Sequence, residues 1–494
     1  MTKHRLVAIG DGLAQGFTSG AIFAADLSYP SIIAEAMGLD RSQFCIPSFH
    51  GHGGLPFNIE YWLRRLGERY GNDLQVLELL GAPFRLRGWL SEAEEYWERG
   101  GGARPQYPLS IFHNLASWGM TVDDAVHLTA GYCASQCAQP TSANLFSRVP
   151  KNAFYRTLLS VINPAQRVEL ASWTVLDCAR ELSIANGIEN LIVALGVENA
   201  LGTITQLEIR PTDDRIQTDP AGSKTLFNLW RPEHFAAIYR QLVQALQVLH
   251  ADRVFLATVP HVTIFPLVRG VGKKLEHRLF HDPRYFKFYT YFWICDEVFD
   301  PEQHPHLTGD QAKEIDATID AYNVTIRDAV ADHQARGLQW FLVDLCDVFE
   351  QLAFRRYQEI GLAPSGGVYE FPSGWIQALQ GKGLSALTTH YLEADQNRVQ
   401  RGGMFGLDGV HPTTMGYALV AQEFIKVMQQ EAHVPFLSPI TGSERLEPIQ
   451  LNYSRMLRRD TLVNTPPSLL DDAVATFRWL EDWVGLRSIL GGLA

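Results

Sequence analysis

Short apolar runs without regular alternation of polar residues constrain the fold of this sequence most. The four clearest are Leu6–Gly10, Leu191–Gly196, Val254–Val259 and Phe341–Leu345. Runs of this kind are typical of parallel strands that are covered on both faces. A fifth and weaker candidate is Ser110–Trp118. The sequence therefore predicts a sheet of about five strands that are mostly parallel.

Helical patterns lie between these runs. The segment Tyr29–Met37 follows the first run, and the segment Phe235–Leu249 precedes the third with apolar residues on one helical face. Strands that alternate with helices form doubly wound sheets, which carry their sites beyond the carboxyl ends of the strands. We therefore expect a doubly wound, flavodoxin-like α/β fold with a site at the carboxyl edge of its sheet.

The predicted strands are separated by unusually long segments. Residues 45–109, 260–340 and 350–400 exceed what simple crossovers need, so we expect insertions there within one α/β domain over 1–435. Residues 440–494 are expected to form a helical extension that packs on this domain. In it, Ser468 is placed to cap a helix whose apolar face is formed by Leu470, Val474, Phe477, Leu480 and Val484.

Charge and hydropathy exclude several classes of partner. The formal net charge is −12, and a surface with that balance repels nucleic acid and anionic lipid. No apolar run reaches the roughly 18 residues of a membrane span. The apolar run at the start of the sequence is too short for a signal peptide. We therefore expect a soluble, cytoplasmic protein with no nucleic-acid partner and no membrane span; its oligomeric state stays open.

The cysteine pattern gives no sign of a metal centre. Six cysteines are spread thinly, and only Cys133 and Cys137 lie close together in the sequence. No second Cys or His pair stands at the spacing of a zinc site. We therefore expect buried, reduced thiols, with no metal and no cofactor.

Glycine-marked turns follow three of the predicted strands, and a fourth motif lies near the end of the domain. The turns are Gly10-Asp11-Gly12, Ser117-Trp118-Gly119 and Gly196-Val197-Glu198-Asn199, and the fourth motif is Asp408-Gly409-Val410-His411-Pro412. In this order they resemble the blocks of the SGNH (GDSL-type) hydrolases. That family has Gly-Asp-Ser, a glycine, Gly-x-Asn-Asp or Gly-x-Asn-Asn, and Asp-x-x-His-Pro. The resemblance spans about residues 5–430, interrupted by the insertions.

The resemblance implies an ester or acyl hydrolase. In that family a serine attacks the carbonyl, a histidine removes the serine proton, and an aspartate orients the histidine. Asp408 and His411 match the aspartate and the histidine, and Gly119 matches the glycine whose N–H helps to hold the oxyanion. Asp11 matches the acid of the first turn, where it bonds the turn backbone.

Two positions depart from the family pattern. Gly12 stands at the serine position and has no nucleophile, and Glu198 stands where the oxyanion asparagine belongs. A carboxylate has no N–H to donate. Loss of the nucleophile costs about 10⁶ in rate and loss of one oxyanion donor about 10²–10³. We therefore expect no serine-type esterase activity, although Asn199 could reach the oxyanion position if the turn shifted by one residue.

Three functions stay open. The first is a pseudoenzyme whose cleft binds at most a small ester or acyl ligand. The second is a hydrolase in which His411, oriented by Asp408, activates water with Glu198 as a second acid or base. The third is a divalent-cation site formed by Asp11, Glu198, Asp408 and His411. We expect Gly12, Glu198 and His411 to surround one cleft, and Gly12→Ser with Glu198→Asn to gain more esterase activity than either change alone.

Overall fold

The core of the molecule is a parallel sheet. The computed structural model describes residues 3–71, 81–105, 111–138, 150–217, 226–275, 282–357, 361–438 and 441–492. The strands lie in the order β1 (Val7–Gly10), β4 (Ile188–Ala194), β5 (Ala251–Ala257) and β9 (Trp340–Val343). Every pair in this sheet is parallel. The four strands predicted from the clearest apolar runs are confirmed.

The weaker fifth candidate contributes a single bridge. Asn114 pairs in parallel with Ala8, and the hydrogen bonds run from Ala8 N to His113 O and from Leu115 N to Ala8 O, both 2.8 Å. A further backbone bond continues along β1, from Ser117 N to Gly10 O at 3.0 Å. The Asn114 side chain donates to Ala14 O and accepts from Ala116 N. The described residues 111–118 thus run beside β1 without forming a regular strand, and Ser110 lies outside the described residues.

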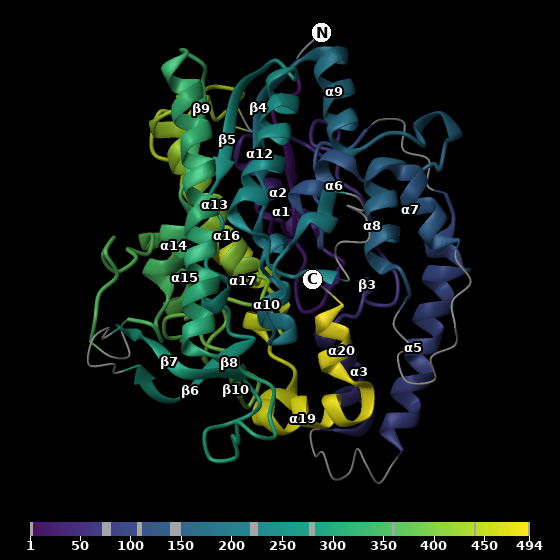
Figure 1. Ribbon diagram of the computed structural model, residues 1–494, viewed down its shortest axis with the longest axis vertical. Helices are drawn as coiled ribbons and strands as arrows, with labels where there is room; N and C mark the ends of the chain where they lie inside the picture. Colours follow the sequence, from purple (N-terminus) through teal and green to yellow (C-terminus); the bar gives the residue numbers. More distant parts are fainter. Residues whose placement is uncertain are drawn as a thin grey trace.

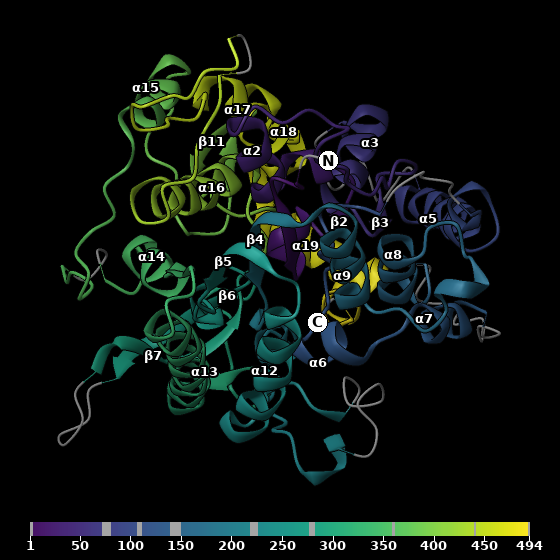
Figure 2. The same cartoon turned by 90° about the horizontal axis from the view of Figure 1, so that it is seen from above.

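Helices cover both faces of the sheet, which confirms the mixed α/β class. Figure 2 shows α2 (Tyr29–Ala36) and α16 (Thr414–Gln430) on one side, and α12 (Pro232–Gln247) and α13 (Gly309–Ala335) on the other. The members of each pair pack against each other, and α13 and α16 both contact β9. The helices predicted over 29–37 and 235–249 are α2 and α12. The side chain of Ser28 caps α2 by accepting a hydrogen bond from Ser31 N.

The long connections carry secondary structure of their own. A three-stranded antiparallel sheet lies within 260–340 and contacts α13; its strands are β6 (Val268–Leu275), β7 (Asp282–Tyr291) and β8 (Leu307–Thr308). The two-stranded sheets are β2 (Ala21–Ile22) with β3 (Leu55–Pro56), and β10 (Glu393–Asp395) with β11 (Arg398–Arg401). The other α-helices described before residue 400 are α1 (Gly12–Gln15), α3 (Ile59–Tyr70), α5 (Ala82–Glu98), α6 (Val122–His127), α7 (Ala130–Cys137), α8 (Ala153–Ile162), α9 (Val175–Asn186), α10 (Gly202–Gln206), α14 (Leu345–Leu352) and α15 (Ser373–Gly381).

The C-terminal segment is helical. Its helices are α17 (Tyr453–Arg459), α18 (Thr461–Asn464), α19 (Ala473–Val484) and α20 (Leu486–Gly491). In Figure 1, α19 and α20 lie below the sheet, and α20 contacts α10. The prediction that Ser468 caps the main helix is wrong, because Ser468 begins a 3-10 turn and Asp472 caps α19 by accepting from Ala475 N. Of the described helices, none combines the length and the apolar character that a membrane crossing requires.

Candidate active site at the carboxyl edge of the sheet

The first turn is held by Asp11. This residue follows β1 and caps the short helix α1, since its Oδ1 accepts a hydrogen bond from Leu13 N at 3.1 Å. Gly12 is the first residue of α1 and is buried. On the neighbouring helix α16, the Tyr417 hydroxyl donates to Phe17 O at 2.5 Å. The turn after β1 is therefore fixed against the helix that follows His411.

The predicted pair of Asp408 and His411 is present. Asp408 Oδ2 lies 3.2 Å from His411 Nδ1, as expected for an orienting carboxylate. Asp408 also accepts backbone N–H groups, from Gly20 to Oδ2 and from Val410 and His411 to Oδ1, at 2.8–2.9 Å. Burial acts to raise the pKa of Asp408, but His411 and the backbone donors outweigh it and lower the pKa. The carboxylate is therefore held in its charged form.

The ring of His411 occupies the space where a side chain at residue 12 would begin. A Cβ built on Gly12 would lie 2.4 Å from His411 Nε2, 2.9 Å from Cδ2 and 3.3 Å from Trp118 Cβ. The Phe17 ring, with its centroid 4.6 Å from that of His411, packs against the imidazole. A serine hydroxyl needs hydrogen-bond distance to the base, with its Cβ farther away than that. The position of the ring therefore leaves no room for a serine.

The carboxylate of Glu198 lies on the N–H group that the resemblance assigns to the oxyanion. Glu198 belongs to a 3-10 turn directly after β4, and its Oε1 accepts from Gly119 N at 3.0 Å. Gly119 has a left-handed φ of 73°, and a Cβ there would lie 2.9 Å from the Phe154 ring. The Gly119 N–H therefore already donates to a negatively charged group of the protein, in the place where it would donate to the oxyanion of a substrate.

Asn199 points to a different partner. Its Oδ1 accepts a hydrogen bond from Val122 N, in the first turn of α6, at 3.2 Å, and the side chain is fully buried. A shift of the turn by one residue would have to break this bond. Asn199 is therefore placed to join α6 to the turn after β4.

The four ionisable residues of the site form a buried network. Asp11, Glu198, Asp408 and His411 are between 1% and 6% exposed. Burial, and then the charge of Glu198, raises the pKa of Asp11 to about 8. Burial acts to lower the pKa of His411, but the carboxylates of Asp408, Glu198 and Asp11 outweigh it and raise the pKa. The structure thus brings the predicted residues together in the protein interior.

A second polar cluster was not predicted from the sequence. It consists of His261, Asp320 and Cys346, whose ligand atoms are close enough together to hold a metal ion. Among the described residues, this is the group of His, Cys, Asp and Glu side chains that meets that condition. Asp11, Glu198, Asp408 and His411 do not form such a group. His261 and Cys346 each follow a buried strand, and this position in the sequence is the signal that would have pointed to them.

No protein-family model and no curated protein matches the sequence.

Proposed function

We propose that the protein is a catalytically silent protein of the SGNH-hydrolase type, in which the former catalytic residues stabilise the core. The observation that carries this proposal is the 2.4 Å separation between a Cβ at residue 12 and His411 Nε2. The bond from Gly119 N to Glu198 Oε1 supports it, because it engages an oxyanion donor with a fixed carboxylate.

The order of strands supports the flavodoxin-like arrangement that this proposal requires. The Asn114 segment lies beside β1, on the edge opposite β4, because Ala8 bonds to His113 and Leu115 while Val7 and Ile9 face β4. With that segment counted, the parallel order in chain sequence is 2-1-3-4-5, which is the order of flavodoxin-like sheets.

The water-activating alternative is not favoured by the position of His411. A Cβ at residue 12 would lie 2.4 Å from Nε2, closer than the roughly 2.7 Å that a hydrogen-bonded water needs, and the side chain is buried. A cation shared by Asp11, Glu198, Asp408 and His411 is not favoured either, since the metal-binding geometry lies elsewhere.

The proposal predicts that the purified protein has no serine-esterase activity. With a short-chain aryl ester, we expect the wild-type rate to equal that of His411→Gln, and we expect no acyl-enzyme burst. A fluorophosphonate probe should not label the peptide that contains Gly12. A hydrolysis rate that disappears in His411→Gln, or a burst, would contradict the proposal. A Cβ at residue 12 would lie 2.4 Å from His411 Nε2. We therefore no longer expect the double variant Gly12→Ser with Glu198→Asn to gain esterase activity.

A cavity away from Gly12 favours the binding of a small acyl-type ligand. It encloses about 170 Å³, and its walls include Arg355, Arg356, Arg401, Phe286, Tyr289 and Phe292. Burial, and then the charges of Arg401 and Arg355, lowers the pKa of the neighbouring His390 to about 4. The smaller part of this shift, from Arg401 and Arg355, reflects their positive charge beside His390. Arg356 is paired with Asp316 and Glu350, and Arg401 with Glu393, so a ligand carboxylate would share these guanidinium groups with protein carboxylates. Guanidinium groups beside aromatic rings suit a molecule with a carboxylate and an apolar chain.

We therefore expect hexanoate to stabilise the protein and hexanol, which has no charge, to have no such effect. At ten times its Kd, a ligand that binds only the folded state adds about 1.4 kcal/mol to the free energy of unfolding. Thermal denaturation with each compound measures this difference. Arg401→Gln should abolish the shift with hexanoate, and an equal shift with both compounds would rule out a carboxylate site.

A further inference from the structure

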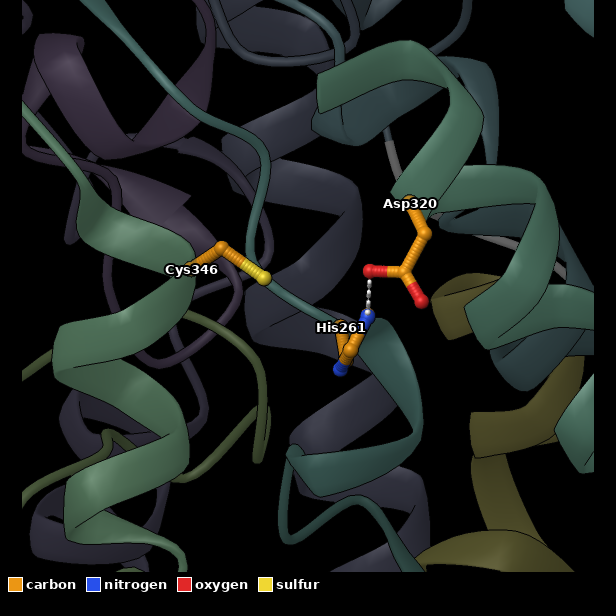
Figure 3. A group of neighbouring side chains, drawn as sticks. All are labelled: His261, Asp320 and Cys346. Carbon is orange, nitrogen blue, oxygen red and sulfur yellow. Dashed lines mark hydrogen bonds and ion pairs between the residues drawn. The ribbon is translucent and has the colours of Figure 1, made fainter. Parts of the chain in front are cut away.

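A cluster of three different metal-binding side chains lies beyond the carboxyl ends of β5 and β9. Figure 3 shows His261, Asp320 and Cys346 directed toward one another. One ligand atom from each residue lies within 4.8 Å of the other two. His261 comes from the loop after β5, Asp320 from α13, and Cys346 from the first turn of α14. Three separate elements therefore converge on one point.

The orientation of the His261 ring is fixed by hydrogen bonds to both of its nitrogens. Nδ1 lies 2.6 Å from Glu350 Oε1. Glu350 is held in turn by Arg356 Nη1 at 2.6 Å and by the Tyr357 hydroxyl. The opposite nitrogen, Nε2, lies 3.0 Å from Asp320 Oδ1. Nδ1 is thus directed toward Glu350 and Nε2 toward Asp320.

The helices place these groups by their periodicity. Cys346 and Glu350 are four residues apart on α14, so they share one face of that helix. The backbone N–H of Cys346 donates to Thr258 Oγ1 at 2.9 Å, which anchors the start of α14 to the end of β5. Cys346 is 6% exposed and His261 is 8% exposed, whereas 65% of the Asp320 side chain is exposed. The cluster is rigid on one side and open to solvent on the other.

We propose that His261 Nε2, a carboxylate oxygen of Asp320 and Cys346 Sγ bind a zinc ion. Imidazole, carboxylate and thiolate are the ligand types that zinc takes, and three protein ligands leave a fourth position for water or another molecule. Glu350 provides the carboxylate that a zinc-bound histidine commonly holds with its other nitrogen. This inference does not rest on the silent Gly12 site.

Zinc binding requires small movements and the release of protons. Bond lengths of about 2.0–2.3 Å in a tetrahedral site separate the ligand atoms by roughly 3.4–3.8 Å. The widest pair therefore has to close by about 1 Å, and the exposed side chain of Asp320 can move once its bond to His261 Nε2 is replaced by the ion. Cys346 loses its thiol proton, His261 loses the proton on Nε2, and both protons pass to solvent as the ion binds.

The test is metal binding by the full chain. Zinc added to the protein, followed by dialysis and elemental analysis, should leave one ion per chain. With Co²⁺ in its place, the protein should show the visible bands of a tetrahedral site and a thiolate-to-cobalt charge-transfer band. Cys346→Ser should abolish the charge-transfer band. Asp320→Asn should keep the band but weaken affinity, because even loss of an outer partner costs about 10–100-fold.

Matched controls separate this site from adventitious binding. Asp332→Asn changes another exposed aspartate of α13, and Cys137→Ser removes a thiol elsewhere. Both should bind zinc as the wild type does. Asp320 is exposed, so Asp320→Asn should fold normally, and circular dichroism checks this. Substoichiometric zinc in the wild type, or equal affinity in the wild type, Cys346→Ser and Asp320→Asn, would overturn the proposal.

Discussion

Gly12→Ala is expected to destabilise the folded protein by about 1–3 kcal/mol, the usual cost of overpacking a core. The new methyl group would lie 2.4 Å from His411 Nε2 and 3.3 Å from Trp118 Cβ. His411 cannot turn away freely, because Asp408 holds its Nδ1 and the Phe17 ring packs against it. The free energy of unfolding, measured with urea, gives the size of the effect.

A double-mutant cycle tests the cause. In a His411→Ala background the imidazole is gone, so Gly12→Ala should cost little there. The coupling energy between the two sites should then be at least about 1 kcal/mol. A cost that is equal in both backgrounds would show that the ring of His411 does not occupy this space.

Gly88 provides the matched control for helix propensity. Gly88 lies inside α5, and a Cβ there would meet no atom within 4 Å. Gly88→Ala should therefore stabilise the protein by up to about 1 kcal/mol, as alanine does in an exposed helix. Gly12→Ala is expected to lower the free energy of unfolding and Gly88→Ala to raise it, so the two variants separate the effect of packing from that of helix propensity.

Asp408→Ala is expected to have the largest effect, a loss of about 3–5 kcal/mol of stability. The change removes the carboxylate that partners His411 and leaves three buried backbone N–H groups, those of Gly20, Val410 and His411, without this acceptor. Asp408→Asn retains an acceptor and should cost less. Replacement of the exposed Asp332 by alanine is the control, and it should change stability by less than about 0.5 kcal/mol.

The contribution of Asp408 and His411 to the free energy of unfolding should depend on pH, and it should fall at both low and high pH. The pKa of Asp408 is lowered from 3.8, so its contribution is complete above pH 3.8 and is lost as pH falls through the folded-state pKa. The pKa of His411 is raised from 6.5, so its contribution is complete below pH 6.5 and is lost as pH rises through the folded-state pKa. The difference between wild type and Asp408→Ala should therefore be largest between pH 3.8 and 6.5. A difference that does not change with pH would show that the pair is uncharged.

Much of the fold was predictable because buried parallel strands leave a strong local signal. The apolar runs that became β1, β4, β5 and β9 are uninterrupted, since helices cover both faces of the sheet. Residues 110–118 gave the same kind of signal, but their described part, 111–118, forms one bridge and a further bond from Ser117 N to Gly10 O rather than a regular strand.

The sequence indicated which residues lie in the candidate site, but not which contacts their side chains make. Spacing on one loop indicated that Asp408 would orient His411, and the two side chains are 3.2 Å apart. The sequence also showed that Gly12 has no nucleophile. It did not show that the ring of His411 fills the space beside Gly12, or that Glu198 accepts the hydrogen bond of Gly119. These contacts join residues that are far apart in the chain.

By itself, the sequence determined the α/β class, the four main strands and the absence of a serine at residue 12, because each of these depends on local residue type and period. Tertiary structure alone decided that the site residues are buried and that His261, Asp320 and Cys346 meet. The physical reason is that side chains 26 to 85 residues apart become neighbours only when separate strands and helices pack, and local patterns do not record that packing.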